Sequence, residues 1–397
     1  MARIIFMTDF SEAYARGLLL GIAKYSQNVG RAWSICRLSL SIRDKYGIKA
    51  VVDYAKKMKM DAIIGQFKPD DDVELFTENG IIAIAQESTV RFSGISNIVG
   101  DNYNEGVIAA KHLLNKGFTN FAYYGAKNVI WSDERQQGFS DTLKAAKRPI
   151  TLSELEISNT DVWEYDYETV SQWLERLPKP VAIFACDDNR ANNITEVCRY
   201  IRINSANGHR LRIPEDITLL GVDNDETICR LSIPNTSSIA IDVVGGGYDT
   251  AKYIDQQLYL KPEERFAEDI LVHPLNVVTR QSSDILVNDD PYVAKTLRYI
   301  SANLSNKIKV DDIVNEVPVS RRILEERFKK ELGTSIYDYI IQMRIDRITE
   351  LLREGLSVSD AAYQMGFSDI KNLSRTFKKF KGISPFEYRK MKPHIQH

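Results

Sequence analysis

The C-terminal segment Ser357 to Arg389 has the sequence SVSDAAYQMGFSDIKNLSRTFKKFKGISPFEYR, in which two short helical patterns flank a glycine. The small side chains of Ala361 and Ala362 allow two helices to approach closely. Gly366 supplies the positive φ that a tight interhelical corner needs. We expect the second helix to open at Ser368. The segment therefore predicts a helix-turn-helix.

The same pattern occurs once before, in Ser320 to Tyr339, with the sequence SRRILEERFKKELGTSIYDY. Seven residues of this segment recur 49 positions later, which indicates one repeated unit in fixed register. The pairs are Leu324 and Leu373, Phe328 and Phe377, Lys329 and Lys378, Lys330 and Lys379, Gly333 and Gly382, Ser335 and Ser384, and Tyr339 and Tyr388. Two helix-turn-helix units are therefore predicted, connected by an amphipathic helix over Ile336 to Arg353.

The second helix of the later unit carries outward-facing polar side chains, namely Lys371, Asn372, Ser374 and Arg375. Side chains of these types can hydrogen-bond base edges or phosphates in a DNA major groove. The charge distribution agrees, because the chain from Pro291 onward has 20 Lys and Arg against 13 Asp and Glu, whereas the remainder has 32 against 41. A basic end on an acidic body suits a nucleic-acid-binding domain.

Residues Tyr292 to Lys390 resemble the DNA-binding domain of the AraC/XylS family of transcription regulators. The resemblance rests on Gly366-Phe367-Ser368-Asp369, Phe377-Lys378-Lys379 and the run GISPFEYR that ends at Arg389; the first unit departs from the pattern at Pro318. It implies double-stranded DNA and RNA polymerase as partners. The residues implied to face the bases are Arg321, Arg322, Glu325 and Glu326 in the first unit and Lys371, Asn372, Ser374 and Arg375 in the second. An all-α interaction domain is the alternative.

The first 280 residues show a different pattern, in which short apolar runs alternate with amphipathic segments. This alternation is typical of parallel sheets covered by helices, and the length fits two doubly wound lobes. Strands are predicted at Arg3 to Met7, Trp33 to Leu38, Ala62 to Gly65, Ile81 to Ala85, Phe121 to Tyr124, Val181 to Ala185 and Ile217 to Val222. Helices are predicted at Glu12 to Gln27, Ile48 to Lys57, Asn104 to Asn115, Glu134 to Ala146, Tyr167 to Leu174, Arg190 to Tyr200 and Gly246 to Leu260.

Polar and aromatic residues follow several predicted strands, at the sheet edge where α/β folds bind ligands. A sugar pocket needs carboxylates that accept hydroxyl hydrogens, an arginine that donates, and an aromatic ring against the sugar's apolar face. The chain offers one such set, with Asp101, Asp187 and Asp223 as acceptors, Arg135 as donor, and Trp131, Phe10 or Tyr14 as the ring. Each aspartate could instead cap a helix or belong to a turn.

Four runs in this region resemble, in order, the effector domain of LacI-type repressors, which is related to periplasmic sugar-binding proteins. They are IVGDNYNEGVIAAKHLLNKGFTNFAYYG, ERQQGF, FACDDNRANN and ITLLGVDNDE. The resemblance implies an α/β, two-lobed, type I periplasmic-binding-protein-like sensor at residues 1–282. A linker at 283–291 and an all-α AraC-type double helix-turn-helix domain at 292–397 would follow. The N-terminal helix-turn-helix and hinge of LacI-type repressors are missing.

The combination of the two parts is similar to xylose-responsive activators. That similarity implies D-xylose as effector and Asp101, Arg135 and Asp223 as sugar contacts, with Asp187 or Asp188 beside them. We therefore expect an activator of sugar catabolism that works as a homodimer. Another pentose or hexose as effector, and a sugar-binding transport protein, remain alternatives.

Other features of the sequence narrow the class of protein. The N-terminus, MARIIFMTDF, has no long apolar run, so no signal peptide or membrane span is predicted and a cytoplasmic location is expected. The four cysteines are scattered, so no metal site is expected, and no cofactor is implied. No GxSxG, P-loop or HExxH motif occurs, and we do not expect an enzyme.

Overall fold

The structure is a computed structural model of the chain. It describes residues 2–30, 32–86, 89–146, 151–157, 166–204, 211–285, 290–306, 308–353, 355–367 and 369–390. These residues cluster into two compact units, Met1–Asp284 and Ile285–His397. The division falls inside the linker predicted at 283–291, of which residues 286–289 lie outside the described ranges. Each helix within those ranges is too short or too polar to cross a lipid bilayer.

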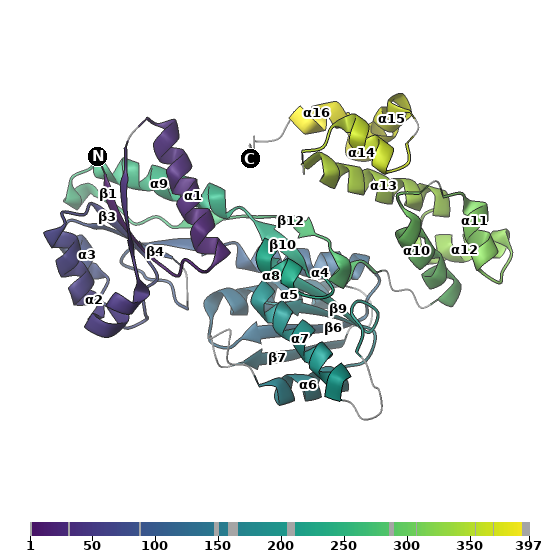
Figure 1. Ribbon diagram of the computed structural model, residues 1–397, viewed down its shortest axis with the longest axis horizontal. Coiled ribbons are helices and arrows are strands. Elements are labelled where there is room, and N and C mark those ends of the chain that lie inside the picture. The colour runs from purple at the N-terminus through teal and green to yellow at the C-terminus, as the bar shows by residue number, and fades with distance from the viewer. Residues whose placement is uncertain are drawn as a thin grey trace. The chain divides into compact units, whose positions relative to one another are not determined.

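The first unit consists of two lobes, each built on one sheet (Figure 1). In the first lobe the strand order is β11-β5-β4-β3-β1-β2, and neighbouring strands are parallel. Its strands are β1 (Arg3–Met7), β2 (Ser34–Leu38), β3 (Ala62–Gly65), β4 (Ile82–Gln86), β5 (Ser96–Gly100) and β11 (Ile270–Val272). Its helices are α1 (Ala13–Asn28), α2 (Leu40–Lys57), α3 (Glu74–Glu78) and α9 (Val243–Leu258), with a 3-10 turn at Pro262–Glu264.

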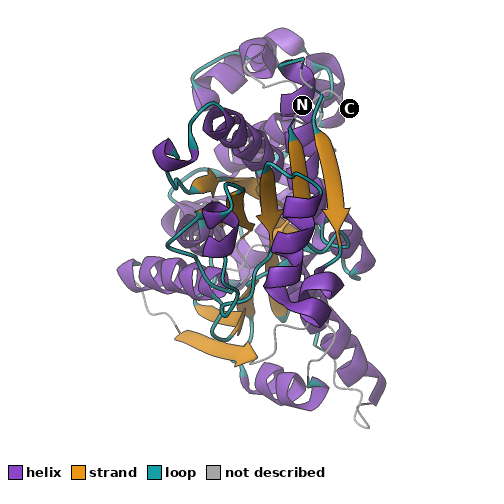
Figure 2. Ribbon diagram, turned by 90° about the vertical axis from the view of Figure 1, so that its left-hand side faces the viewer, coloured by secondary structure: helices purple, strands orange, loops and turns teal. Residues whose placement is uncertain are grey.

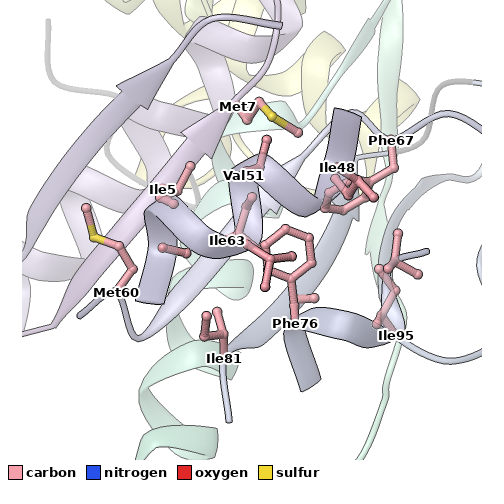
Figure 3. Close-up of a cluster of buried hydrophobic side chains, with 14 of the residues drawn as sticks. Ile5, Met7, Ile48, Val51, Met60, Ile63, Phe67, Phe76, Ile81 and Ile95 are labelled. Carbon is pink, nitrogen blue, oxygen red and sulfur yellow. The ribbon is translucent and has the colours of Figure 1, made fainter. Parts of the chain in front are cut away.

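The central strands of this sheet are nearly continuous apolar runs, which suits them to a sheet covered on both faces. One face packs against α2 and α3, where Ile63 meets Val51 and Phe76 (Figure 3). The opposite face packs against α1 and α9 through a second cluster that includes Leu18 and Ile254. Full burial of each such side chain stabilises the fold by roughly 1.5–3 kcal/mol. The lobe therefore holds the residues at its strand ends on a well-packed support.

The second lobe has the strand order β12-β10-β9-β8-β6-β7, and helices lie on both sides of the strands (Figure 2). Only β12 is antiparallel to its neighbour in this sheet. The strands are β6 (Asn120–Ala126), β7 (Thr151–Ile157), β8 (Val181–Ala185), β9 (Ile217–Asp223), β10 (Ser237–Ile241) and β12 (Pro274–Val278). The helices are α4 (Asn102–Asn115), α5 (Ile130–Ala145), α6 (Tyr167–Arg176), α7 (Asp188–Asn204) and α8 (Glu226–Leu231), with a 3-10 turn at Gln281–Ser283.

The chain passes between the lobes at three adjacent points, after β5, after β10 and between β11 and β12. Backbone hydrogen bonds join these crossings: the Asp101 amide donates to the Val272 carbonyl at 3.0 Å, and the Asp242 amide donates to the His273 carbonyl at 2.9 Å. Three short crossings tied together in this way form a hinge, and the carboxyl ends of several strands in each sheet lie next to it.

The second unit is all helical. Its helices are α10 (Pro291–Asn303), α11 (Val310–Glu316), α12 (Arg321–Leu332), α13 (Ile336–Arg353), α14 (Val358–Gln364), α15 (Ile370–Lys381) and α16 (Pro385–Lys390). Helix α13 belongs to two cores at once. Ile336 and Ile340 pack with α10, α11 and α12, whereas Ile345 and Ile348 pack with α14 and α15. One continuous helix therefore connects the two helix-turn-helix units, as predicted.

The duplication seen in the sequence is also present in the structure. Gly333 and Gly382 end α12 and α15 with φ of 71° and 79°, and the amide of each donates to the carbonyl four residues earlier at 2.9 Å. The paired aromatic residues make the same edge-to-face contact. The rings of Phe328 and Tyr339 are 5.5 Å apart, and those of Phe377 and Tyr388 are 5.8 Å apart. The two units share their packing as well as their sequence.

Some element boundaries differ from those predicted. Helix α2 begins at Leu40 rather than at Ile48, with an irregular residue at Gly47 (φ 76°). Helix α5 begins at Ile130 rather than at Glu134, so Trp131 lies in its first turn. Asp369 caps α15 by accepting from the Lys371 amide at 2.9 Å; Ser368, predicted to open this helix, lies outside the described residues.

Candidate functional site

A cavity of about 270 Å³ lies between the two lobes of the first unit, beside the hinge. The first lobe contributes Glu12, Tyr14, Gln66, Gln86, Thr89 and Gly100 to its lining. The second lobe contributes Asn102, Glu105, Val129, Trp131, Arg135, Asp187, Asn189, Arg190 and Asp223, and Ile241 comes from the end of β10. The lining contains four carboxylates and two guanidinium groups, so the cavity is rich in charged groups.

Arg135 makes contacts in three directions and is 5% exposed. Its Nε donates to Glu105 Oε2 at 2.5 Å, its Nη1 donates to the Cys186 carbonyl at 2.6 Å, and its Nη2 lies 3.6 Å from Asp223 Oδ1. Burial lowers the pKa of Arg135, but Glu105 and Asp223 more than offset this, so the pKa is raised overall. The guanidinium is therefore charged, and it fixes the positions of two carboxylates at the cavity.

Close packing of α4 against α5 brings Arg135 and Glu105 together. A Cβ on Gly106 would lie 2.1 Å from the Arg135 carbonyl oxygen, and a Cβ on Gly138 would lie 1.9 Å from the Tyr103 carbonyl oxygen. Only glycine fits at such distances, so the two helices cross backbone against backbone. The side chains next to the crossing then meet directly over the cavity.

A second guanidinium–carboxylate pair lines the cavity at the start of α7. Asp187 accepts from the backbone amide of Arg190 at 2.7 Å and from its Nη1. The Trp131 indole packs against both arginines, with the guanidinium carbon of Arg135 at 5.1 Å and that of Arg190 at 5.8 Å from the ring. Trp131 is thus an aromatic surface at the cavity, held in place by two cations.

Asp223 is the last residue of β9 and has an unusual backbone conformation, with φ of 97°. Such a conformation is strained for a residue with a side chain and is found most often at functional sites. Burial raises the pKa of Asp223 to about 7; Arg135 opposes the rise, whereas Asp187, Glu105 and Glu12 add to it. Burial and the nearby Asp187 also raise the pKa of Glu12. The carboxylates at the cavity therefore repel one another.

The structure places five of the predicted ligand residues at the cavity: Tyr14, Trp131, Arg135, Asp187 and Asp223. It does not bring Phe10, Asp101 or Asp188 to the lining. The Phe10 ring packs against Phe6 at 5.6 Å. Asp101 lies at the hinge, where its neighbours Gly100 and Asn102 line the cavity instead. Asp188 is 2% exposed, and its carboxylate accepts from the Asp225 amide at 2.8 Å, so it joins α7 to the start of α8.

Several lining residues were absent from the predicted set, above all Glu105, Gln66 and Gln86. Gln66 follows β3 directly, so the rule of examining strand ends could have found it. Glu105 lies within α4, where an acidic residue in sequence looks like part of a solvated face. Within the described residues, Gln86 Oε1 and Glu105 Oε1 are buried and accept no hydrogen bond. Buried acceptors without donors favour a ligand that carries hydroxyl groups.

The charge pattern defines what the cavity can hold. The guanidinium groups of Arg135 and Arg190 are each already paired with a carboxylate, and the lining carries more acids than bases. An anionic ligand would meet repulsion, whereas a neutral polyhydroxylated ligand could donate to the carboxylates and stack on Trp131. The described residues contain no group of three or more His, Cys, Asp and Glu that could hold a metal ion.

We predict that ligand affinity rises with pH through the titration of Asp223. A hydroxyl donates to a carboxylate more strongly than to a carboxylic acid, and Asp223 has a pKa of about 7. The affinity for a hydroxylated ligand should therefore be roughly five- to ten-fold weaker at pH 6 than at pH 8. Isothermal titration between pH 6 and pH 8 measures this change in affinity. Asp223→Asn should flatten the profile; an unchanged slope in that variant would assign the effect to another group.

The free protein should show the opposite trend. A carboxyl whose pKa is higher in the folded state than in the unfolded state favours folding at low pH, and this contribution is lost as pH rises toward the folded pKa. Asp223 should thus lower the stability of the unliganded first unit between pH 4 and about pH 7. Thermal unfolding of wild type and Asp223→Asn over this range gives the comparison.

An ion pair joins the two lobes at the edge of the cavity. Arg91, in the loop after β4 of the first lobe, donates Nη1 and Nη2 to the two oxygens of Glu134 on α5 of the second lobe, both at 2.8 Å. Glu134 also accepts from Asn102 Nδ2 at 3.0 Å, and Asn102 lines the cavity. The pair therefore links the closure of the lobes to the position of a lining residue.

Breaking this pair should weaken ligand binding without destroying it. A bidentate pair that is about one-third exposed contributes on the order of 0.5–1 kcal/mol, so Arg91→Ala should weaken ligand affinity roughly two- to five-fold. Arg91→Glu should weaken it further, and the exchange Arg91→Glu with Glu134→Arg should restore it. Arg199→Ala is the matched control, since Arg199 pairs with Glu196 on the same helix, α7, and not across the lobes in the part of the chain that the structure describes. Failure of the exchange to restore affinity would contradict the interlobe role.

In the second unit, α12 and α15 expose the side chains predicted to face DNA. Arg321, Arg322, Glu325 and Glu326 are exposed on α12 and line a shallow groove with Lys329. On α15, Lys371, Asn372 and Arg375 are exposed and Ser374 is half-buried. Helix α15 carries five Lys and Arg and no acidic residue, whereas α12 carries five against three acidic residues. Of the two helices, α15 of the later helix-turn-helix therefore presents the more cationic surface.

Comparisons with known proteins agree with both parts of the chain. Residues 110–283 match the periplasmic binding protein-like domain, and residues 313–391 match a helix-turn-helix domain. The chain is a DNA-binding transcription regulator in which a periplasmic-binding-protein-like domain of the LacI type precedes an AraC-type helix-turn-helix domain.

The particular proteins that it resembles match it over almost their whole length. The chain is 29% identical to the xylose operon regulatory protein of Escherichia coli K12, covering 98% of this chain and 96% of the relative. It is 28% identical to that of Haemophilus influenzae, covering 98% of each. The solved structure of the xylose-binding transcription activator XylR matches 99% of this chain and 98% of its own, with 26% identity and a TM-score of 0.58.

Proposed function

We propose that this protein activates transcription of sugar-catabolic genes when D-xylose binds between the two lobes of its first unit. The observation that carries the proposal is the polar cavity beside the hinge, joined in one chain to two helix-turn-helix units, the later of which has a strongly basic α15. The cavity combines acceptors for several hydroxyl groups with an aromatic surface, as an aldopentose requires. The relatives' names, which refer to xylose, support this choice of sugar.

The proposed mechanism is lobe closure. A sugar that donates to carboxylates from both lobes lowers the free energy of the closed arrangement relative to the open one. In a homodimer bound to repeated half-sites, closure would change the spacing of the DNA-reading helices and present the protein to RNA polymerase. The coupling between sugar and DNA binding is expected to be on the order of 1–3 kcal/mol.

The test has two parts, both on the full chain. Thermal unfolding with a panel of pentoses and hexoses, followed by isothermal titration of each stabilising sugar, identifies the effector. Retardation of promoter fragments with and without that sugar then measures the coupling. We expect D-xylose to give the largest rise in melting temperature. Another sugar with a larger rise would replace D-xylose, and stabilisation by none would refute the sensor.

A further inference from the structure

The first turn of α12 contains two adjacent arginines that differ in how their nitrogens are used. Arg321 donates its Nε to Glu325 at 3.0 Å and its Nη1 to Asp311 of α11 at 2.7 Å. Arg322 donates only its Nε, to Glu326 at 3.0 Å. Among the described residues, no protein group accepts from Nη1 or Nη2 of Arg322. The two side chains therefore offer different chemistry to the solvent.

Arg321 and Arg322 also differ in how much of each side chain is exposed to solvent. The Arg322 side chain is 87% exposed, whereas that of Arg321 is 52% exposed and is held between two helices. Guanine presents two acceptors, O6 and N7, on its major-groove edge, and an arginine reads them with two nitrogens that point the same way. Arg322 has both terminal nitrogens available for this contact. Arg321 retains one.

Glu326 gives Arg322 a defined direction. A carboxylate on Nε fixes the plane of the guanidinium, so less side-chain entropy is lost when the base is bound. The Glu326 carboxylate is also 64% exposed, and it can accept from a cytosine amino group beside the guanine. An acid that repels phosphate is then compatible with DNA binding, because it faces bases rather than the backbone.

The duplicated unit supports the same division. The 49-residue offset pairs Arg322 with Lys371, which is again an exposed cation. It pairs Arg321 with Ile370, which has no charge and no polar group. This position holds isoleucine in one helix-turn-helix and an arginine bound to the neighbouring helix in the other. It is therefore suited to contacts between the two helices of the unit. A position that is cationic in both units suits contact with DNA.

We propose that Arg322 reads a guanine in the major groove, that Glu326 is its positioning residue, and that Arg321 clamps α11 to α12 without contacting a base. The proposal rests on DNA binding by the second unit and goes beyond it by assigning the base and the residue that selects it. It also divides four predicted DNA-facing residues of α12 into one reader, one positioning residue and one clamp, and leaves Glu325 as the clamp's partner.

The experiment is selection of binding sites from a randomised DNA library by the full-length protein and its variants. The wild type should select a site with one guanine that Arg322→Ala no longer prefers. For the best wild-type site, Arg322→Ala should lose roughly 5- to 150-fold in affinity. Arg322→Lys should keep the salt dependence of binding but lose the guanine preference, because an ammonium lacks the two-pronged donor. Glu326→Gln should weaken the same preference in part.

Arg321→Ala is the matched control, from the neighbouring position in the same helical turn. It should retain the guanine preference, with a smaller affinity loss that is uniform across sequences. Loss of that preference in Arg321→Ala, or its retention in Arg322→Ala, would overturn the assignment. A wild-type protein that selects no sequence would instead refute DNA recognition itself, so the two failures are distinguishable. Unchanged thermal unfolding of Arg322→Ala excludes a folding defect.

Discussion

Replacing Arg135 with alanine should abolish the response to sugar while DNA binding by the second unit persists. The guanidinium contacts Glu105, Cys186 and Asp223 at once. Without it, the buried Glu105 carboxylate loses the cation with which it pairs, and Asp223 loses the guanidinium that lowers its pKa. The variant loses a charged hydrogen bond and the fixed positions of the two carboxylates. Sugar binding should therefore weaken roughly 100-fold or more.

Two measurements separate binding from folding. Isothermal titration gives the sugar affinity, and retardation of promoter DNA without sugar reports whether the second unit is intact. Removal of one member of a buried pair destabilises proteins by roughly 3–5 kcal/mol, so Arg135→Ala alone can unfold the second lobe. The double variant Arg135→Met with Glu105→Gln removes both members of the buried pair and should fold, yet it should still not bind the sugar.

Arg199→Ala provides the surface control for the same lobe. Arg199 lies on α7, is exposed, and among the described residues it pairs with Glu196 of the same helix. The Arg199→Ala variant should bind sugar as the wild type does. Normal induction by the Arg135 variants would mean that the sugar is recognised elsewhere, and the cavity between the lobes would then have to be reassigned.

Of two paired residues that line the cavity, the sequence singled out Arg135 as a candidate ligand residue but not Glu105, and the reason is physical. Arg135 sits in a motif with a known resemblance, whereas Glu105 becomes buried only because Gly106 and Gly138 let α4 and α5 touch. Contacts between helices separated by strand β6 depend on tertiary packing, which local periodicity does not encode. Asp101 shows the reverse case. A polar residue after a strand is a correct signal for the hinge edge, but the side chain that reaches the cavity belongs to Asn102.

Three interior strands have the bounds that the sequence predicts. β1, β3 and β8 have the predicted bounds because both of their faces are buried and their sequences are continuous apolar runs. β7, β11 and β12 were not predicted; they lie at sheet edges, and polar residues interrupt the apolar pattern of β7 and β12. β5 and β10 were not predicted either, although they lie inside their sheets and are mostly buried, because serine and asparagine stand among the apolar residues of SNIVG and SSIAI. The three crossings at the hinge were also beyond prediction, since nothing local marks where the chain changes lobe.

Replacing Phe377 with alanine should disable the second helix-turn-helix unit. Phe377 is fully buried and its ring packs edge-to-face against Tyr388 at 5.8 Å. Truncation of such a core phenylalanine costs about 3–5 kcal/mol, which is comparable to the stability of a small subdomain. The two units share α13, so they bind DNA as a linked pair, and loss of one should weaken DNA affinity roughly 100-fold or more.

The duplication supplies the matched variant, Phe328→Ala, at the equivalent position of the first unit, while Tyr337→Ala on the exposed face of α13 serves as the neutral control. Because α15 has no acidic residue to offset its five cations and α12 has three, Phe377→Ala should also reduce the salt dependence of DNA affinity more than Phe328→Ala does. Equal salt slopes in the two variants would contradict this division, because the affinity from phosphate contacts would then be shared evenly by the two units.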